Sequence, residues 1–88
     1  MLEERLQEKI LNTIDEMAFI QAYVFKETDL DRVDAARDDF FDKLNILRLL
    51  LSIQIPNREE RNTVVDYIRD GVLDREWRKY VNAFETRG

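Results

Sequence analysis

The first third of the chain carries apolar residues at steps of three or four positions. They are Leu6, Ile10, Ile14, Met17, Ile20 and Val24. This spacing places them on one face of an α-helix, and no glycine or proline interrupts the stretch. The pattern therefore predicts one long amphipathic helix over residues 2–27.

A second long helix is predicted over residues 29–54. Thr28 precedes it and Asp31 follows three positions later, the arrangement of a capping box in which a hydroxyl and a carboxylate bond the first amides. Pro56 ends this helix, because the residue before a proline is disfavoured in the α conformation. One face of the helix is apolar: Val33, Ala36, Phe40, Leu44, Leu47 and Leu51.

The end of this second helix, from Ile46 to Ile55, is apolar on almost every side. An all-round apolar helix is a buried one, either at the centre of this chain or between copies of it. Because one packing face does not require so wide an apolar surface, we expect self-association, with a dimer favoured. The residues expected at that contact are Leu47, Leu50, Leu51 and Ile53.

Two shorter helices are predicted in the last third of the chain. Asn57 is a favourable N-cap for a helix over 58–70, and Gly71 is expected to end it in the left-handed conformation. Asp74 is expected to cap a last helix over 75–85.

The connections between these helices are short, which favours antiparallel neighbours. The sequence therefore predicts an all-α fold with one domain over residues 1–88. We expect a long antiparallel helical hairpin and two shorter helices, together forming a small helical bundle that self-associates.

Composition limits how such a chain is stabilised. Cysteine and histidine are absent, which excludes disulfides and metal sites built on thiolate or imidazole. No cofactor or metal is expected. A chain of 88 residues has a small core, and this favours oligomerisation or docking on a partner. Since no signal peptide or membrane-spanning stretch is recognisable, we expect a soluble, cytoplasmic protein without membrane contact.

Catalytic chemistry has little support in the sequence. Besides the missing histidine and cysteine, Ser52 is the only serine and lies within the apolar segment. There is no glycine-rich phosphate loop and no metal-binding pair of a histidine with an acid. We do not expect an enzyme.

Charge is distributed unevenly along the chain. The net charge is −5; residues 1–44 contain twelve acids and six bases, whereas residues 45–88 contain seven acids and eight bases. A protein that binds DNA or RNA normally presents a basic surface. Direct binding to nucleic acid is therefore not expected.

Four aspartates recur at steps of three, four and four along the second predicted helix and share one helical face. This acidic row consists of Asp31, Asp34, Asp38 and Asp42. Like charges four positions apart repel one another, by about 0.2–0.5 kcal/mol for each pair. Choices that are locally unfavourable tend to mark functional surface. The row is the predicted contact surface for a partner, with a plain solvated face as the alternative.

A group of aromatic residues near the C-terminus is a second candidate contact. Trp77, Tyr80 and Phe84 share one side of the last predicted helix and stand among arginines. Such side chains are enriched at the energetic centres of protein interfaces. A short terminal helix also needs large side chains to dock on its own bundle, so core closure is the alternative.

These observations favour a small acidic regulator or inhibitor that binds a basic protein target stoichiometrically, as anti-defence, antitoxin and immunity proteins do. The alternative is a helical oligomerisation or assembly module. A third hypothesis is a protein that sequesters a small, nucleotide-like ligand, with Tyr23, Trp77 and Tyr80 forming the pocket.

Overall fold

The computed structural model describes the backbone of residues 2–85 and the side chains of residues 4–81. Within this part of the chain all regular structure is helical, as predicted. The elements, in order, are α1 (Leu2–Lys26), α2 (Leu30–Gln54), α3 (Arg58–Gly71), the π-helical turn η1 (Val72–Glu76) and α4 (Arg78–Glu85).

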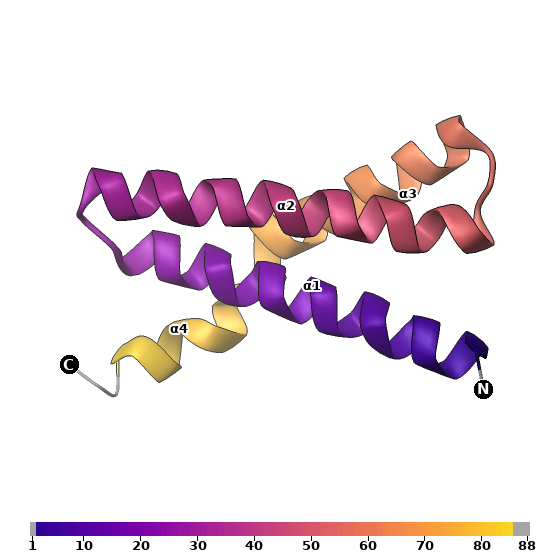
Figure 1. Ribbon diagram of the computed structural model, residues 1–88. Helices are drawn as coiled ribbons and strands as arrows, with labels where there is room; N and C mark the ends of the chain where they lie inside the picture. The colour runs from indigo at the N-terminus through magenta and orange to yellow at the C-terminus, as the bar shows by residue number, and fades with distance from the viewer. Residues whose placement is uncertain (1, 86–88) are drawn as a thin grey trace.

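The two long helices form the antiparallel hairpin that the pattern predicted (Figure 1). Each has 25 residues, or about 37 Å at the rise of an α-helix, which accounts for most of the 43 Å length of the molecule. α3 turns back along α2, and α4 lies beside the C-terminal half of α1. The predicted fold class, a hairpin with two shorter helices, is confirmed.

The core lies where the hairpin meets α3 and η1. Met17 of α1, Leu47 of α2, Val65 of α3 and Val72 of η1 are almost completely buried there. Full burial of a side chain of this kind stabilises the fold by about 1.5–3 kcal/mol. Since these four residues come from four elements, the core joins the hairpin to the C-terminal part of the chain.

The start of α2 differs from the prediction by one residue. Its N-cap is Asp29, whose side chain accepts a hydrogen bond from the Asp31 amide at 3.0 Å. The prediction that Thr28 caps α2 is wrong. The backbone amides of Thr28 and Asp29 donate hydrogen bonds to the Glu27 carboxylate, at 3.1 and 3.0 Å. Glu27, which follows the end of α1, therefore organises the turn.

The predicted cap of α3 is confirmed. The side chain of Asn57 accepts from the Glu60 amide at 3.0 Å, which satisfies one of the donors left without a partner at the start of a helix.

The predicted end of α3 is wrong. Gly71 has a φ of −62°, which is right-handed helical and not left-handed. The chain continues into η1, where the Trp77 amide donates to the Val72 carbonyl five positions back, at 3.3 Å. Asp74, the expected cap of the last helix, lies inside this turn. The physical reason is burial, because continuing the helix places Val72 on the same face as Val65, two turns earlier.

We expect Gly71→Ala to stabilise the protein by about 0.5–1 kcal/mol, because glycine within a helix loses more backbone freedom on folding than alanine. A Cβ at this position would have the Arg75 guanidinium as its nearest neighbour, at 3.8 Å, which is an ordinary contact. Urea unfolding of both proteins measures the difference. A loss of stability in the alanine variant would mean that position 71 requires the left-handed conformation.

Candidate functional site

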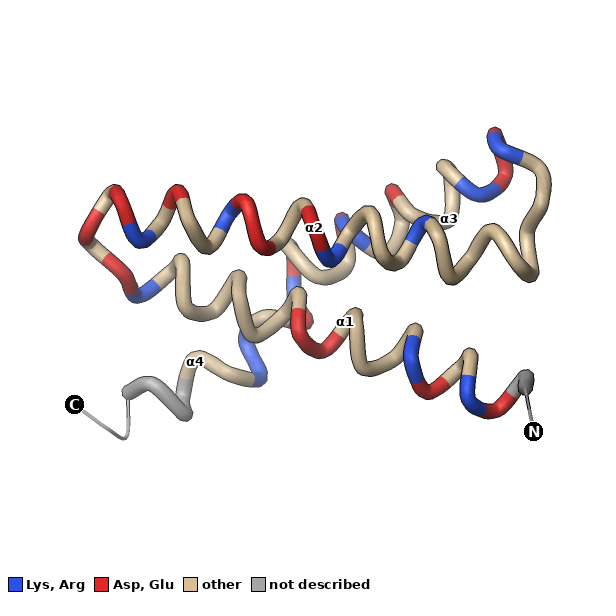
Figure 2. The backbone as a smooth tube through the Cα atoms, viewed as in Figure 1, with Lys and Arg blue, Asp and Glu red and all other residues tan. Residues whose placement is uncertain are grey.

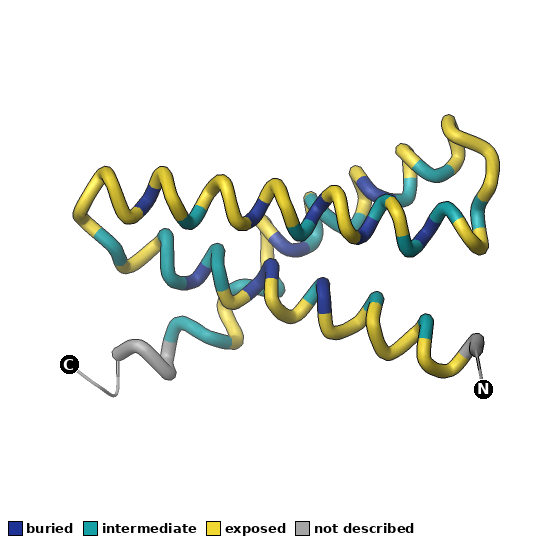
Figure 3. The backbone as a smooth tube through the Cα atoms, in the orientation of Figure 1, coloured by how far each residue is buried: buried dark blue, intermediate teal, exposed yellow. Residues whose placement is uncertain are grey.

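The acidic row follows the outer face of α2. Asp31, Asp34, Asp38 and Asp42 are all exposed, and acidic residues gather in the half of α2 that lies next to the turn with α1 (Figure 2). The buried residues of α2 point the opposite way, toward α1 and α3. Buried and exposed positions recur along α2 (Figure 3), and in the half of the helix next to the turn the exposed side is the acidic one.

No residue that the structure describes forms an ion pair with a carboxylate of the row. Two neighbouring cations are used elsewhere: Lys43 pairs with Glu16 of α1 at 3.0 Å, and the hydrogen bond to that carboxylate raises the pKa of Lys43. Arg32 pairs with Glu27 and Asp29, at 3.8 and 3.9 Å. Neither cation forms an ion pair with the row, although the charge of Asp42 also contributes to raising the pKa of Lys43.

The row is a linear arrangement of charges and not a chelating site. Among the described residues, no three side chains of the metal-binding types are grouped closely enough to hold a metal ion. Carboxylates spread along a helix match a surface that carries several cations better than a single ion.

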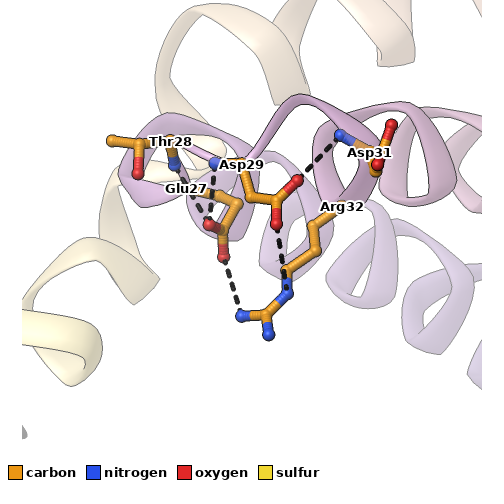
Figure 4. A network of polar contacts seen from close by, with 5 residues as sticks. All are labelled: Glu27, Thr28, Asp29, Asp31 and Arg32. Carbon is orange, nitrogen blue, oxygen red and sulfur yellow. Dashed lines mark hydrogen bonds and ion pairs between the residues drawn. The ribbon is translucent and has the colours of Figure 1, made fainter.

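The turn between α1 and α2 fixes where the acidic row begins (Figure 4). The Asp29 amide, the Tyr23 hydroxyl and the Thr28 amide donate hydrogen bonds to Glu27, and Arg32 lies nearby. These contacts favour the ionised carboxylate and hold the pKa of Glu27 below its ordinary value, with the Asp29 amide as the largest cause. The hydrogen bond to Glu27 raises the pKa of Tyr23.

We expect Glu27→Gln to be less stable than the parent protein at neutral pH, because the neutral amide is a weaker acceptor for these donors. A carboxyl group with a lowered pKa stabilises the fold above its ordinary pKa, and this contribution is lost as the pH falls through the lowered value. The two proteins should therefore converge in stability under acid conditions. Urea unfolding across the pH range tests this, and a difference that stays constant with pH would contradict it.

The C-terminal aromatic residues make contacts within the chain. Trp77 packs on Phe25, with ring centroids 4.6 Å apart, and Tyr80 meets the ring of Phe19 edge-on at 5.8 Å. Both partners belong to α1, so these rings dock the C-terminal segment on the hairpin. Phe84 lies outside the side chains that the structure describes.

Tyr23, one of the three rings of the small-ligand hypothesis, lies in a groove on the surface of the hairpin. Tyr23 lines a groove between α1 and α2 of about 410 Å³, together with Phe19 and Ile20. Trp77 and Tyr80 are not among the residues that line this groove.

The predicted contact between copies divides into buried and accessible residues. Leu47 and Leu51 belong to the core of the chain. Leu50 is partly buried, and Ile53 is 70% exposed. The helix has a buried and an exposed side here despite its all-round apolar sequence, because only one side of it faces α1 and α3.

An apolar patch remains on the open side of α2, at helical spacing. It consists of Ile46, Leu49, Leu50 and Ile53, with Leu49 75% and Ile46 45% exposed. A contiguous exposed apolar patch is a candidate for a contact site. The patch follows the acidic row along the same helix.

A group of arginines at the turn from α2 to α3 was not predicted from the sequence. Arg48, Arg58 and Arg61 line one cleft there. The one local signal available in the sequence is Arg48, the single charged residue between Leu44 and Ile55. Spacing along one helix does not reveal such a group, because its members come from two helices.

The sequence matches no protein-family model, and no curated protein or solved structure is significantly similar to it. Within the described part of the chain, no helix combines the length and the apolar character needed to cross a membrane. A function is therefore proposed from the surfaces described above: the acidic row, the apolar patch and the group of arginines.

Proposed function

We propose that this protein is a stoichiometric regulator or inhibitor that binds a basic protein partner through the acidic row. The observation that carries the proposal is the exposure of all four carboxylates together with the absence of any ion pair to them among the described residues. Lys43 and Arg32, which lie next to the row in the sequence, pair with other acids instead. A partner that supplies arginine or lysine relieves the repulsion.

Charge and shape supply different parts of such an interaction. A row of like charges accelerates encounter with an oppositely charged surface and selects against acidic partners. An apolar side chain at the contact adds affinity by excluding water. Phe41, which is 60% exposed, lies beside Asp38 and Asp42 on α2 and provides that anchor. We infer a partner surface with basic residues around an apolar depression.

Reversing two charges of the row, in Asp34→Lys/Asp38→Lys, should weaken binding of the partner by at least about tenfold. The partner is first recovered by cross-linking to the parent protein in cells of its source and identified by mass spectrometry. The affinity of each variant for that purified partner is then measured by calorimetry. Because the charges are exposed, the affinity of the parent protein should also fall as salt is added.

The matched control is Glu8→Lys/Glu59→Lys, which changes the net charge equally at exposed positions away from the row. It should retain most of the affinity, and circular dichroism should show equal helicity for both variants. Binding that survives reversal of Asp34 and Asp38, or a partner whose contact surface is acidic, would refute the proposed site.

A second candidate function, a helical assembly module, is favoured by the apolar patch. Its residues follow the steps of three and four by which one helix packs on another, and three of them, Ile46, Leu49 and Ile53, are exposed. Pairing of two patches around a twofold axis would remove these side chains from water.

If the patch forms a contact between copies, Leu49→Glu should convert a dimer into a monomer, since a carboxylate would be buried without a partner. Leu30→Glu is the matched control, because Leu30 is 77% exposed on the same helix outside the patch. Light scattering over a dilution series measures the mass of each protein. A parent protein that is monomeric at every concentration would exclude this second function and leave the first intact.

A further inference from the structure

A cleft rich in arginine lies where the chain turns from α2 into α3. Its volume is about 630 Å³, and the residues that line it are Arg48, Arg58, Arg61, Asn62 and Asp66. The net charge of the protein is −5, so a group of three cations is a local reversal of the overall charge. The acidic row begins at the opposite end of α2 (Figure 2).

The turn between the helices accounts for the placement of these side chains. Arg58, Asn62 and Asp66 recur at steps of four and therefore share one side of α3. Arg48 reaches the cleft from α2. The chain reverses between Ile55 and Asn57, and this reversal brings the first turns of α3 beside the last turns of α2.

The charge of the cleft is positive. Asp66 is paired with Arg69 at 3.6 Å, and Arg69 is not among the residues that line the cleft. Arg61 is held in place by the carbonyls of Ile55 and Pro56, to which its Nη1 donates at 3.3 and 3.5 Å. A guanidinium carries five N–H donors, so these contacts orient Arg61 without using all of them.

One N–H donor of Arg48, at Nε, has no hydrogen-bond acceptor among the described residues. Its Nη1 donates to the Asn45 side chain at 3.3 Å, whereas its Nε is buried and has no acceptor among the described residues. Buried donors of this kind are rare, because each one loses its bond to water without replacing it. Among the donors that the cleft offers to an anionic oxygen are the guanidinium groups of Arg48, Arg58 and Arg61, which line it.

We propose that this cleft binds a small phosphorylated molecule. Guanidinium groups match the oxygens of phosphate in paired hydrogen bonds, and three arginines suit a ligand with more than one negative charge. The cleft is larger than a single phosphate group and falls within the usual range for small-molecule sites. A nucleic-acid backbone is disfavoured, because the chain as a whole would repel it.

Titration with pyrophosphate, followed by two-dimensional NMR, tests the site directly. We expect saturable shifts at Arg48, Arg58, Arg61 and Asn62, and none in the acidic row. Citrate and sodium chloride at equal ionic strength are the comparison titrants. Citrate binding as tight as that of pyrophosphate would overturn the assignment to phosphate. Equal shifts with sodium chloride would mean that ionic strength causes the shifts and that pyrophosphate does not bind at the site. No saturable shift with pyrophosphate would overturn the site.

Two variants locate the binding energy. Arg58→Ala should weaken pyrophosphate binding by about tenfold, and Arg58 is exposed, so the fold should remain intact. Arg48→Lys keeps the charge but loses the paired donors, and it should also weaken binding. Arg75→Ala, which removes an exposed cation outside the cleft, should leave the affinity unchanged. Equal affinities in all four proteins would refute the proposal.

This inference is independent of the proposed protein-binding function. Arg58→Ala should leave capture of the basic partner unchanged, and Asp34→Lys/Asp38→Lys should still show saturable shifts with pyrophosphate. The failure of one proposal is therefore distinguishable from the failure of the other.

Discussion

The packing of α1 against α2 around Met17 and Leu47 is the contact on which the rest of the structure depends. The chain contains no cysteine and therefore no disulfide, so burial of apolar side chains must hold the helices together. Val65 and Val72 join the same core from the C-terminal part of the chain. The aromatic contacts of the C-terminal segment are then made on a surface of α1 that the hairpin has already positioned.

A core on one side of α2 leaves the opposite side without a role in packing. That side carries the acidic row and then the apolar patch, two kinds of surface that are unfavourable in an isolated protein for different reasons. The row concentrates like charges, and the patch leaves aliphatic side chains in water. Contact with another molecule would relieve both costs. This is why the outer face of α2 is the centre of the proposed functions, while its inner face has a structural role.

The helices themselves could be predicted closely, because the signals for them are local. Apolar spacing located both arms of the hairpin, and the cap at Asn57 is formed within one turn. The errors arose where a distant contact or a competing side chain decided the outcome. Glu27 accepts hydrogen bonds from the amides of Thr28 and Asp29, and the N-cap of α2 is Asp29 and not the predicted Thr28. Burial of Val72 keeps the chain helical through Gly71, where the residue type alone favoured a helix end.

The candidate surfaces were predictable only in part. The acidic row lies on one helix, so the spacing of its members is enough to place them on one face. The arginine cleft lies between two helices, and no spacing within either of them could group Arg48 with Arg58.

The sequence by itself determined where the helices lie and which side chains share a helical face, since these follow from interactions between residues a few positions apart. It did not determine which apolar face is buried: Leu47 and Leu49 are close in sequence and equal in chemistry, yet one is buried and the other is 75% exposed. The tertiary structure decided that, because burial depends on how α1 and α3 approach α2, and this approach is the result of the packing of the whole chain.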